Sequence, residues 1–357
     1  MTERYIGLMS GTSLDGIDAV LVGFEQDHPI VLSKFFMPYA EDLKRSILEL
    51  QHPSHDELHL TQLMGNRLAE LYSGAVHSLL AQEPHLPVRA IGCHGQTIRH
   101  RPDLGYTLQI GNAALLAELT GITVISDFRS RDVAAGGQGA PLVPAFHDRV
   151  FRHPEIHRAI VNIGGISNLT DLTPGLPATG FDCGPGNMLM DAWCMEHLQE
   201  PYDRDGSWAE SGKVLPGLLD RLLAEPYFML PPPKSSGRDL FNLGWLKNHL
   251  QNDEAPEDVQ ATLLQLTAAT IAQAIHGAQE IYLCGGGAHN IALRRALSRL
   301  LPATIIRTTN DAGIDGDYLE AIAFAWLARQ NLMGIPANLP LVTGAAHPCI
   351  LGAVYSA

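Results

Sequence analysis

Three glycine-rich segments hold the side chains best suited to chemistry in this sequence, and the first begins at Gly7. Small residues let backbone N–H groups approach a phosphate closely, and serine and threonine hydroxyls add further donors. The segment is longer than a hairpin needs, although Gly, Ser and Asp are also common in plain turns. It lacks the Gly-Lys-Ser/Thr ending of a P-loop. We expect nucleotide phosphates to bind at Ser10, Gly11, Thr12, Ser13, Asp15 and Gly16.

Two carboxylates of this first segment, Asp15 and Asp18, are candidate ligands for Mg²⁺. Hard cations prefer oxygen ligands, and magnesium keeps several waters when it binds nucleotide phosphates. We therefore expect one of the two carboxylates to reach the metal, either directly or through water.

The second and third glycine segments lie in the other half of the chain. The second repeats the pattern of the first, and two such turns facing each other across a cleft hold one triphosphate from both sides. Its candidate residues are Asn162, Gly164, Gly165, Ser167 and Asn168. The third ends a strand in three glycines, where a flat nucleoside can lie against the backbone and asparagine can cap the following helix. Its candidates are Gly285, Gly286, Gly287 and Asn290, with a flexible loop as the alternative interpretation.

A carboxylate next to a fourth turn is the candidate general base. Asp182 stands between Phe181 and Gly184-Pro185-Gly186, and we expect it to project from a rigid turn. A positioned carboxylate can take a proton from a reacting group. The alternatives are an ordinary turn residue or a cap for the helix expected near Met188.

Two arginines close together are candidates for binding an anion. Arg129 and Arg131 carry planar guanidinium groups that match a carboxylate, in a chain whose formal net charge is −14. The alternative is a pair of surface arginines bonded to Asp127 or Asp132. His94, which comes before these arginines in the sequence, is interpreted as a histidine at a strand end whose hydrogen bonds are satisfied.

Alternating strands and helices must position these residues. Periodicity predicts strands at 5–9, 17–24, 30–39, 88–93, 106–110, 123–126, 159–163, 166–172, 281–284 and 304–307. It predicts helices at 58–80 and 113–119, from Asn290, and at 318–330. Such alternation is typical of an α/β layered fold. The second half begins as the first does, with a strand, a glycine turn and another strand, so the length of 357 residues favours two related domains.

Composition narrows the class of protein. Apolar residues make up 46% and charged residues 17%, which is typical of a globular protein. The acidic net charge argues against nucleic-acid and membrane partners. Five cysteines without CxxC spacing indicate reduced thiols, and the N-terminus lacks signal-peptide features, so we expect a cytoplasmic protein. The apolar stretch 261–278 contains polar residues and is expected to be a buried helix.

The strand–turn–strand start of each half resembles the actin-like (ribonuclease H-like) ATPase fold, which sugar kinases and heat-shock ATPases share. Five strings together resemble anhydro-N-acetylmuramic acid kinases: residues 7–18, His94-Gly95-Gln96-Thr97, 127–144, 162–170 and Gly180–Asn187. The resemblance runs from residue 5 to about residue 353. Cys183 departs from the family pattern, where threonine is more common.

The resemblance implies two similar lobes with a nucleotide cleft between them, formed by residues 1–128 with about 341–357 and by residues 129–340. It implies an ATP- and Mg²⁺-dependent kinase with Asp182 as catalytic base. The enzyme would open a 1,6-anhydro amino sugar with water and phosphorylate it to N-acetylmuramate 6-phosphate, during recycling of cell-wall peptidoglycan. A homodimer is also implied. The implied sugar contacts are Asp15, Gln96, Thr97, Arg129, Arg131 and Glu320.

Two other functions remain open from the sequence. A kinase of another free amino sugar or hexose would share the phosphate-binding turns and differ in the acceptor. A chaperone or filament protein with the same fold would turn over ATP without a small acceptor.

Overall fold

The computed structural model describes residues 3–25, 27–83, 87–232, 234–251 and 253–357. The chain forms two compact units, residues 1–150 with 318–357 (unit 1) and residues 151–317 (unit 2). The boundaries expected from the sequence differ, since they assigned 129–150 and 318–340 to the second lobe. In the structure these residues belong to unit 1, because a helix at 319–332 packs on its strands.

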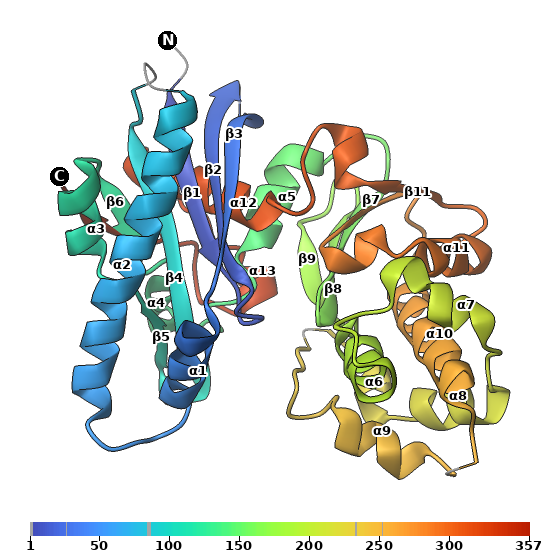
Figure 1. Ribbon diagram of the computed structural model, residues 1–357. Helices are drawn as coiled ribbons and strands as arrows, with labels where there is room; N and C mark the ends of the chain where they lie inside the picture. The colour runs from blue at the N-terminus through green and yellow to red at the C-terminus, as the bar shows by residue number, and fades with distance from the viewer. Residues whose placement is uncertain (1–2, 26, 84–86, 233, 252) are drawn as a thin grey trace. The chain divides into compact units, whose positions relative to one another are not determined.

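Unit 1 is built on a seven-stranded mixed sheet (Figure 1). β1, β2 and β3 are antiparallel neighbours, while β4 runs parallel to β1 and β6 runs parallel to β4. The order is β12-β6-β4-β1-β2-β3, with β5 paired to β4. The strands are β1 (Arg4–Ser10), β2 (Gly16–Glu25), β3 (His28–Pro38), β4 (Ala90–Arg101), β5 (Tyr106–Ile110), β6 (Val124–Ser126) and β12 (Ala353–Tyr355).

Helices cover both faces of this sheet. The helices of unit 1 are α1 (Glu41–Leu50), α2 (Glu57–Gln82), α3 (Ala113–Thr120), α4 (Ser130–Ala134), α5 (Val143–Phe151), α12 (Leu319–Leu332) and α13 (Pro340–Thr343). Ile6 and Leu8 of β1 join the apolar core formed with α1, α2 and α3. Gly7 points the other way, against the backbone of α12, because successive side chains of a strand alternate between faces.

Unit 2 repeats the strand order of unit 1. Its sheet has the order β11-β10-β7-β8-β9, which corresponds to β6-β4-β1-β2-β3. In this sheet β7, β8 and β9 are antiparallel neighbours, β10 runs parallel to β7, and β11 runs parallel to β10. The strands are β7 (Arg158–Ile163), β8 (Ile166–Leu172), β9 (Thr179–Pro185), β10 (Glu280–Cys284) and β11 (Ile305–Thr308). The repeat predicted from the sequence is therefore confirmed.

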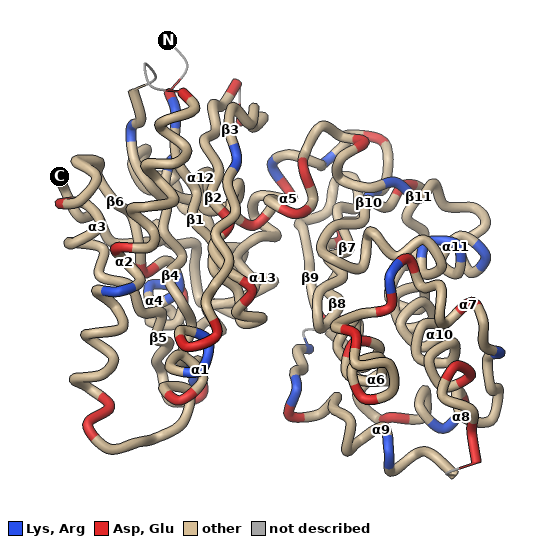
Figure 2. The backbone as a smooth tube through the Cα atoms, viewed as in Figure 1, with Lys and Arg blue, Asp and Glu red and all other residues tan. Residues whose placement is uncertain are grey.

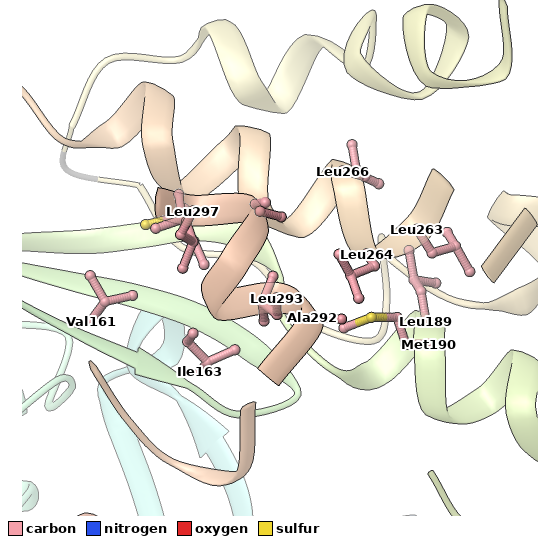
Figure 3. Packing of buried hydrophobic residues seen from close by; sticks show 14 of the residues in the cluster. Val161, Ile163, Leu189, Met190, Leu263, Leu264, Leu266, Ala292, Leu293 and Leu297 are labelled. Carbon is pink, nitrogen blue, oxygen red and sulfur yellow. The ribbon is translucent and has the colours of Figure 1, made fainter. Parts of the chain in front are cut away.

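An apolar core joins the sheet of unit 2 to its helices. Val161 and Ile163 of β7 pack with α6, α10 and α11 (Figure 3). The helices are α6 (Met188–Leu198), α7 (Ser207–Ser211), α8 (Pro216–Leu223), α9 (Leu243–His249), α10 (Pro256–Ala274) and α11 (Ile291–Leu300). Short 3₁₀ turns lie at 102–104, 204–206, 226–229, 286–289 and 309–312.

The predicted strands all occur, although β4 runs to Arg101 instead of ending at Cys93, and β9 and β12 are strands that the sequence did not predict. Asp182 was expected on a turn, but it lies within β9. The glycines and proline of 184–186 concealed the strand, because those residue types are rare in strands. The stretch 261–278 does form a buried helix, α10, as far as Ala274.

No helix among the described residues is long and apolar enough to cross a membrane. Acidic and basic residues are interspersed along both units (Figure 2). The net charge of −14 therefore reflects a general excess of carboxylates rather than one acidic block.

Candidate functional site

The turn at residues 11–15 of the first glycine segment exposes three polar side chains because Leu14, the one apolar residue of the turn, is buried. Leu14 is 3% exposed, has a positive φ of 61°, and its N–H donates to Gly11 O at 3.2 Å. This inward turn leaves Thr12, Ser13 and Asp15 exposed to solvent. Two hydroxyls, one carboxylate and the backbone of Gly11 are thus presented together, while Gly16 begins β2 and is buried.

A buried polar network holds this turn from behind. Ser10 donates to Gly95 O at 3.0 Å and therefore accepts from the Tyr72 hydroxyl at 2.7 Å. Gln96 Nε2 donates to Gly11 O at 3.1 Å, and the Tyr39 hydroxyl donates weakly to Gln96 Oε1 at 3.4 Å. The side chains of Ser10 and Gln96 are 1% and 0% exposed. In this structure both side chains position the turn, and the predicted sugar contact of Gln96 is not accessible.

A bulge in β4 aims these supporting side chains. Leu8 and Ser10 of β1 pair with Cys93 and Gln96 of β4, so two residues of β4, His94 and Gly95, oppose one of β1. Gly95 has a φ of 78°, and a Cβ there would lie 2.9 Å from Ile110 O. Such a bulge re-aims side chains next to a site.

The metal prediction has one exposed candidate. Asp15 is exposed and Asp18 is half-buried within β2. The described residues contain no group of three or more His, Cys, Asp or Glu side chains able to hold a metal ion. This fits a Mg²⁺ ion bound mainly by phosphates and water, for which one carboxylate suffices.

Arg129 is a half-buried guanidinium with several partners inside unit 1. Its Nε and Nη2 donate to His94 Nε2 at 3.1 and 2.9 Å, and its Nη1 donates to Gly139 O at 2.8 Å. Burial lowers the pKa of Arg129, and the carboxylate of Glu320 opposes this shift. Burial raises the pKa of Glu320, in the first turn of α12, and Arg129 opposes that shift in turn. The structure therefore brings Arg129 and Glu320 into electrostatic contact.

Arg131 differs from Arg129 because its side chain is exposed on α4. The predicted alternative, pairing with Asp132, has support for Arg129 alone, because the charge of the Asp132 carboxylate opposes the lowering of the Arg129 pKa. Asp132 is fully buried and accepts hydrogen bonds from Gly139 N, Asn338 Nδ2 and Thr343 Oγ1. These bonds tie the glycine-rich loop after α4 to the C-terminal segment of unit 1. Asp127, the other partner considered for the arginines, accepts a hydrogen bond from the Ser130 hydroxyl. Thr97, a predicted sugar contact, is half-buried on β4.

Three turns of unit 2 lie against one another. Gly164 O and Gly165 O accept from Asn187 N and Gly186 N, both at 2.8 Å. A Cβ on Gly285, whose φ is 75°, would lie 2.3 Å from Asn162 Oδ1. The second and third glycine segments and the turn after Asp182 therefore form one cluster, because β7, β8 and β10 are neighbours in the sheet.

The polar candidates in this cluster differ in accessibility. Ser167 is fully buried and donates to Gly184 O at 3.1 Å, so it supports the turn. Asn290 accepts from Leu293 N at 2.9 Å and caps α11, as predicted. Asn162 and Asn168 are half-buried, and Gly286 is exposed beside Asn187. Gly165 is exposed, while Gly287 is buried against Ile163.

Asp182 is a half-buried carboxylate on the edge strand of unit 2. Burial raises its pKa from 3.8 to about 6, and the Ser236 N–H, which donates to Oδ2 at 3.0 Å, opposes the shift. The backbone of Asp182 is also held, since its N–H donates to Lys234 O and its carbonyl accepts from the Tyr227 hydroxyl. A carboxylate that titrates near neutral pH is suited to general base catalysis.

Sequence reasoning missed the groups that hold these candidates. Tyr72 and Tyr39 lie behind unit 1 candidates, and Lys234 and Ser236 cover the edge of β9 beside Asp182. The polar string Lys234-Ser235-Ser236-Gly237 after three prolines was the available signal for the last two. The interpretation of His94 as a satisfied histidine at a strand end is wrong, because His94 lies within β4 and its Nδ1 has no hydrogen-bond partner among the described residues.

Two α/β units with one strand order, each opening with a strand, a glycine turn and a strand, define the actin-like ATPase and sugar-kinase class. The family model for anhydro-N-acetylmuramic acid kinase matches residues 3–357. The chain belongs to the anhydro-N-acetylmuramic acid kinase family, and it is therefore a kinase.

Similar proteins include kinases of that name. Those of Nitrosospira multiformis and Thiobacillus denitrificans are each 57% identical, covering 99% of this chain and 99% and 98% of their own. A solved ROK family glucokinase from Streptomyces griseus, in complex with glucose and AMPPNP, has a TM-score of 0.42 and 14% identity. That match covers 92% of this chain and 99% of the glucokinase.

Proposed function

We propose that this kinase uses ATP and water to convert 1,6-anhydro-N-acetylmuramic acid into N-acetylmuramate 6-phosphate and ADP. Asp182 carries the proposal, because its half-buried carboxyl has a pKa raised to about 6 and lies beside the clustered glycine turns of unit 2. The whole-length relatives with this name support the choice of acceptor.

The acceptor dictates an unusual reaction. In a 1,6-anhydro sugar, O6 is bonded to the anomeric carbon, so no free 6-hydroxyl exists to attack ATP. The oxygen of water forms a bond to the anomeric carbon while the bond from that carbon to O6 breaks. O6 then forms a bond to the γ-phosphorus, and ADP leaves with the electron pair of the broken P–O bond. Asp182 takes the proton released by the water.

Each unit contributes distinct groups to this proposal. Unit 1 supplies Thr12 and Ser13 as phosphate donors and Asp15 as the exposed carboxylate. Unit 2 supplies the backbone of its glycine turns, for phosphates and nucleoside. Mg²⁺, held by phosphates and by Asp15 or Asp18, would neutralise phosphoryl charge.

The sugar contacts proposed for unit 1 are polar groups that differ in solvent exposure and in how many of their donors are already used within unit 1. The exposed Arg131 and the two remaining N–H groups of Arg129 offer donors for the lactyl carboxylate. Thr97 and Glu320 are proposed to bond sugar hydroxyls. A homodimer, a cytoplasmic location and a role in peptidoglycan recycling stay predictions.

Isotope labelling tests the reaction. In H₂¹⁸O the product should carry one ¹⁸O on the anomeric carbon and none in the new phosphate ester bond. Because the anomeric hydroxyl of a free sugar exchanges slowly with water, a control with unlabelled product in H₂¹⁸O measures that exchange. Absence of label above this control refutes hydrolytic opening and favours a kinase of a free sugar.

A second measurement tests Asp182 itself. Asp182→Asn should bind ATP and sugar as the native enzyme does, yet lose roughly two or more decades of kcat, because a positioned base contributes about 10²–10⁴-fold. Near-native kcat in this variant contradicts the assignment.

A further inference from the structure

His94 is a buried histidine whose side chain contacts the guanidinium of Arg129. Its side chain is 4% exposed, and its Nε2 accepts from both Nε and Nη2 of Arg129. Its Nδ1 has no hydrogen-bond partner in the described part of the chain. The ring packs on Phe324 of α12, with centroids 4.7 Å apart. Both hydrogen bonds that Nε2 of His94 accepts therefore come from one guanidinium.

The charge state of His94 suits Nε2 as a hydrogen-bond acceptor. Two N–H donors point at Nε2, so this nitrogen carries no proton and the ring is the Nδ1–H tautomer. Burial, together with the Arg129 charge, lowers the pKa of His94 to about 3. The imidazole is consequently neutral near pH 7, and no cation–cation repulsion disturbs Arg129.

One further hydrogen bond completes the orientation of Arg129. Nη1 donates to Gly139 O at 2.8 Å, in the loop that Asp132 holds through Gly139 N at 2.7 Å. Three of the five N–H groups of the guanidinium are therefore used within unit 1. The bulge at Gly95 and the packing against Phe324 hold the imidazole in its orientation, and the imidazole in turn holds one edge of the guanidinium.

We propose that His94 is a positioning residue for the sugar: its neutral imidazole holds one edge of Arg129, so that the remaining N–H groups are presented to the carboxylate of the acceptor. This inference rests on the proposed function, because it takes the acceptor to carry a lactyl carboxylate. It assigns His94 a role in sugar affinity and none in ATP binding or proton transfer.

Removing the acceptor nitrogen tests the inference. His94→Leu keeps an apolar side chain against Phe324 but leaves Arg129 without its partner. We expect the KM for 1,6-anhydro-N-acetylmuramic acid to rise roughly tenfold or more, since hydrogen bonds to charged groups are of the strength that gives such factors. The KM for ATP should stay unchanged. An equal change in both KM values, or none in either, overturns the inference.

Two variants at the same position serve as controls. His94→Gln places an amide oxygen near the position of Nε2 and should restore most of the sugar affinity. His94→Asn, whose shorter amide does not reach Arg129, should behave like His94→Leu and replaces it if that variant does not fold. A purely structural histidine predicts no difference between Gln and Asn beyond their thermal stability.

Arg129 variants separate this inference from the proposed function. If Arg129→Ala leaves the sugar KM unchanged, the sugar contact of Arg129 in the proposed function is wrong. If Arg129→Ala raises it and His94→Leu does not, only the positioning role fails. The double variant should match Arg129→Ala alone, because the two residues act through one contact. An acceptor without the lactyl group, 1,6-anhydro-N-acetylglucosamine, should not distinguish His94→Leu from the native enzyme.

Discussion

The protonation state of Asp182 should set the pH dependence of kcat/KM. Removing one hydrogen-bond donor, the Ser236 N–H, should shift that dependence. The carboxyl has a pKa of about 6, raised by burial and restrained by the Ser236 N–H. A base must be ionised to accept a proton, so kcat/KM should rise with pH through an acid limb near pH 6 and level off above it. Ser236→Pro removes this N–H and with it a donor that favours the ionised carboxylate.

The expected shift follows from the energy of one hydrogen bond. A bond to a charged group contributes about 1.5–3 kcal/mol, and replacement by water recovers part of that. A net loss of about 1.4 kcal/mol moves the acid limb upward by about one pH unit. At pH 6 the ionised fraction then falls from about one half to about one tenth, so kcat/KM drops roughly fivefold. At pH 8 the carboxyl stays ionised in both proteins, and their activities should converge.

The assay is the pH profile of kcat/KM for the sugar between pH 5 and pH 9. Ser236→Ala keeps the N–H from which Asp182 accepts and should retain the native acid limb. Ser235→Pro places the same ring one residue earlier without removing the donor. The reasoning fails if Ser236→Pro keeps the native acid limb, or if it loses activity equally at all pH values while folding normally.

Two further predictions concern the glycine turns. Gln96→Leu should raise the KM for ATP several-fold, because Gly11 O loses its buried donor, whereas Tyr72→Phe should have a smaller effect because Ser10 still donates to Gly95 O. Steady-state kinetics at saturating sugar check this, and an unchanged KM for ATP in Gln96→Leu contradicts it. Gly285→Ala should lower the free energy of unfolding by about 1–3 kcal/mol and weaken ATP binding, because its Cβ meets Asn162 Oδ1 at a positive φ. Gly313→Ala is the matched control, with a φ of 79° and no atom near its Cβ, so equal losses in denaturant unfolding refute the role of the contact.

Much of the fold could be predicted from local patterns. The strands on either side of the first two glycine turns follow from alternating apolar residues, and the turns follow from residues that permit tight backbone geometry. The failure at β9 has a local cause as well. Gly184-Pro185-Gly186 has the composition of a turn, while β9 depends on pairing with β8, as where Asp182 pairs with Asn168, 14 residues earlier.

The sequence by itself determined which groups are present and in what order: three glycine segments, an aspartate next to a fourth glycine turn, and two neighbouring arginines in an acidic chain. These are local properties, because only small residues let a backbone approach a phosphate and only certain side chains carry charge. The family could be recognised from these strings alone.

Only the tertiary structure decided which of these groups are free to act. Ser10, Gln96 and Ser167 looked like ligand-binding groups, but packing has buried them behind the turns. His94 and Arg129 are 35 residues apart, and Asp182 and Ser236 are 54 apart. A hydrogen bond depends on the distance and direction between two atoms, and those are set by how the strands and helices pack rather than by the spacing of residues along the chain.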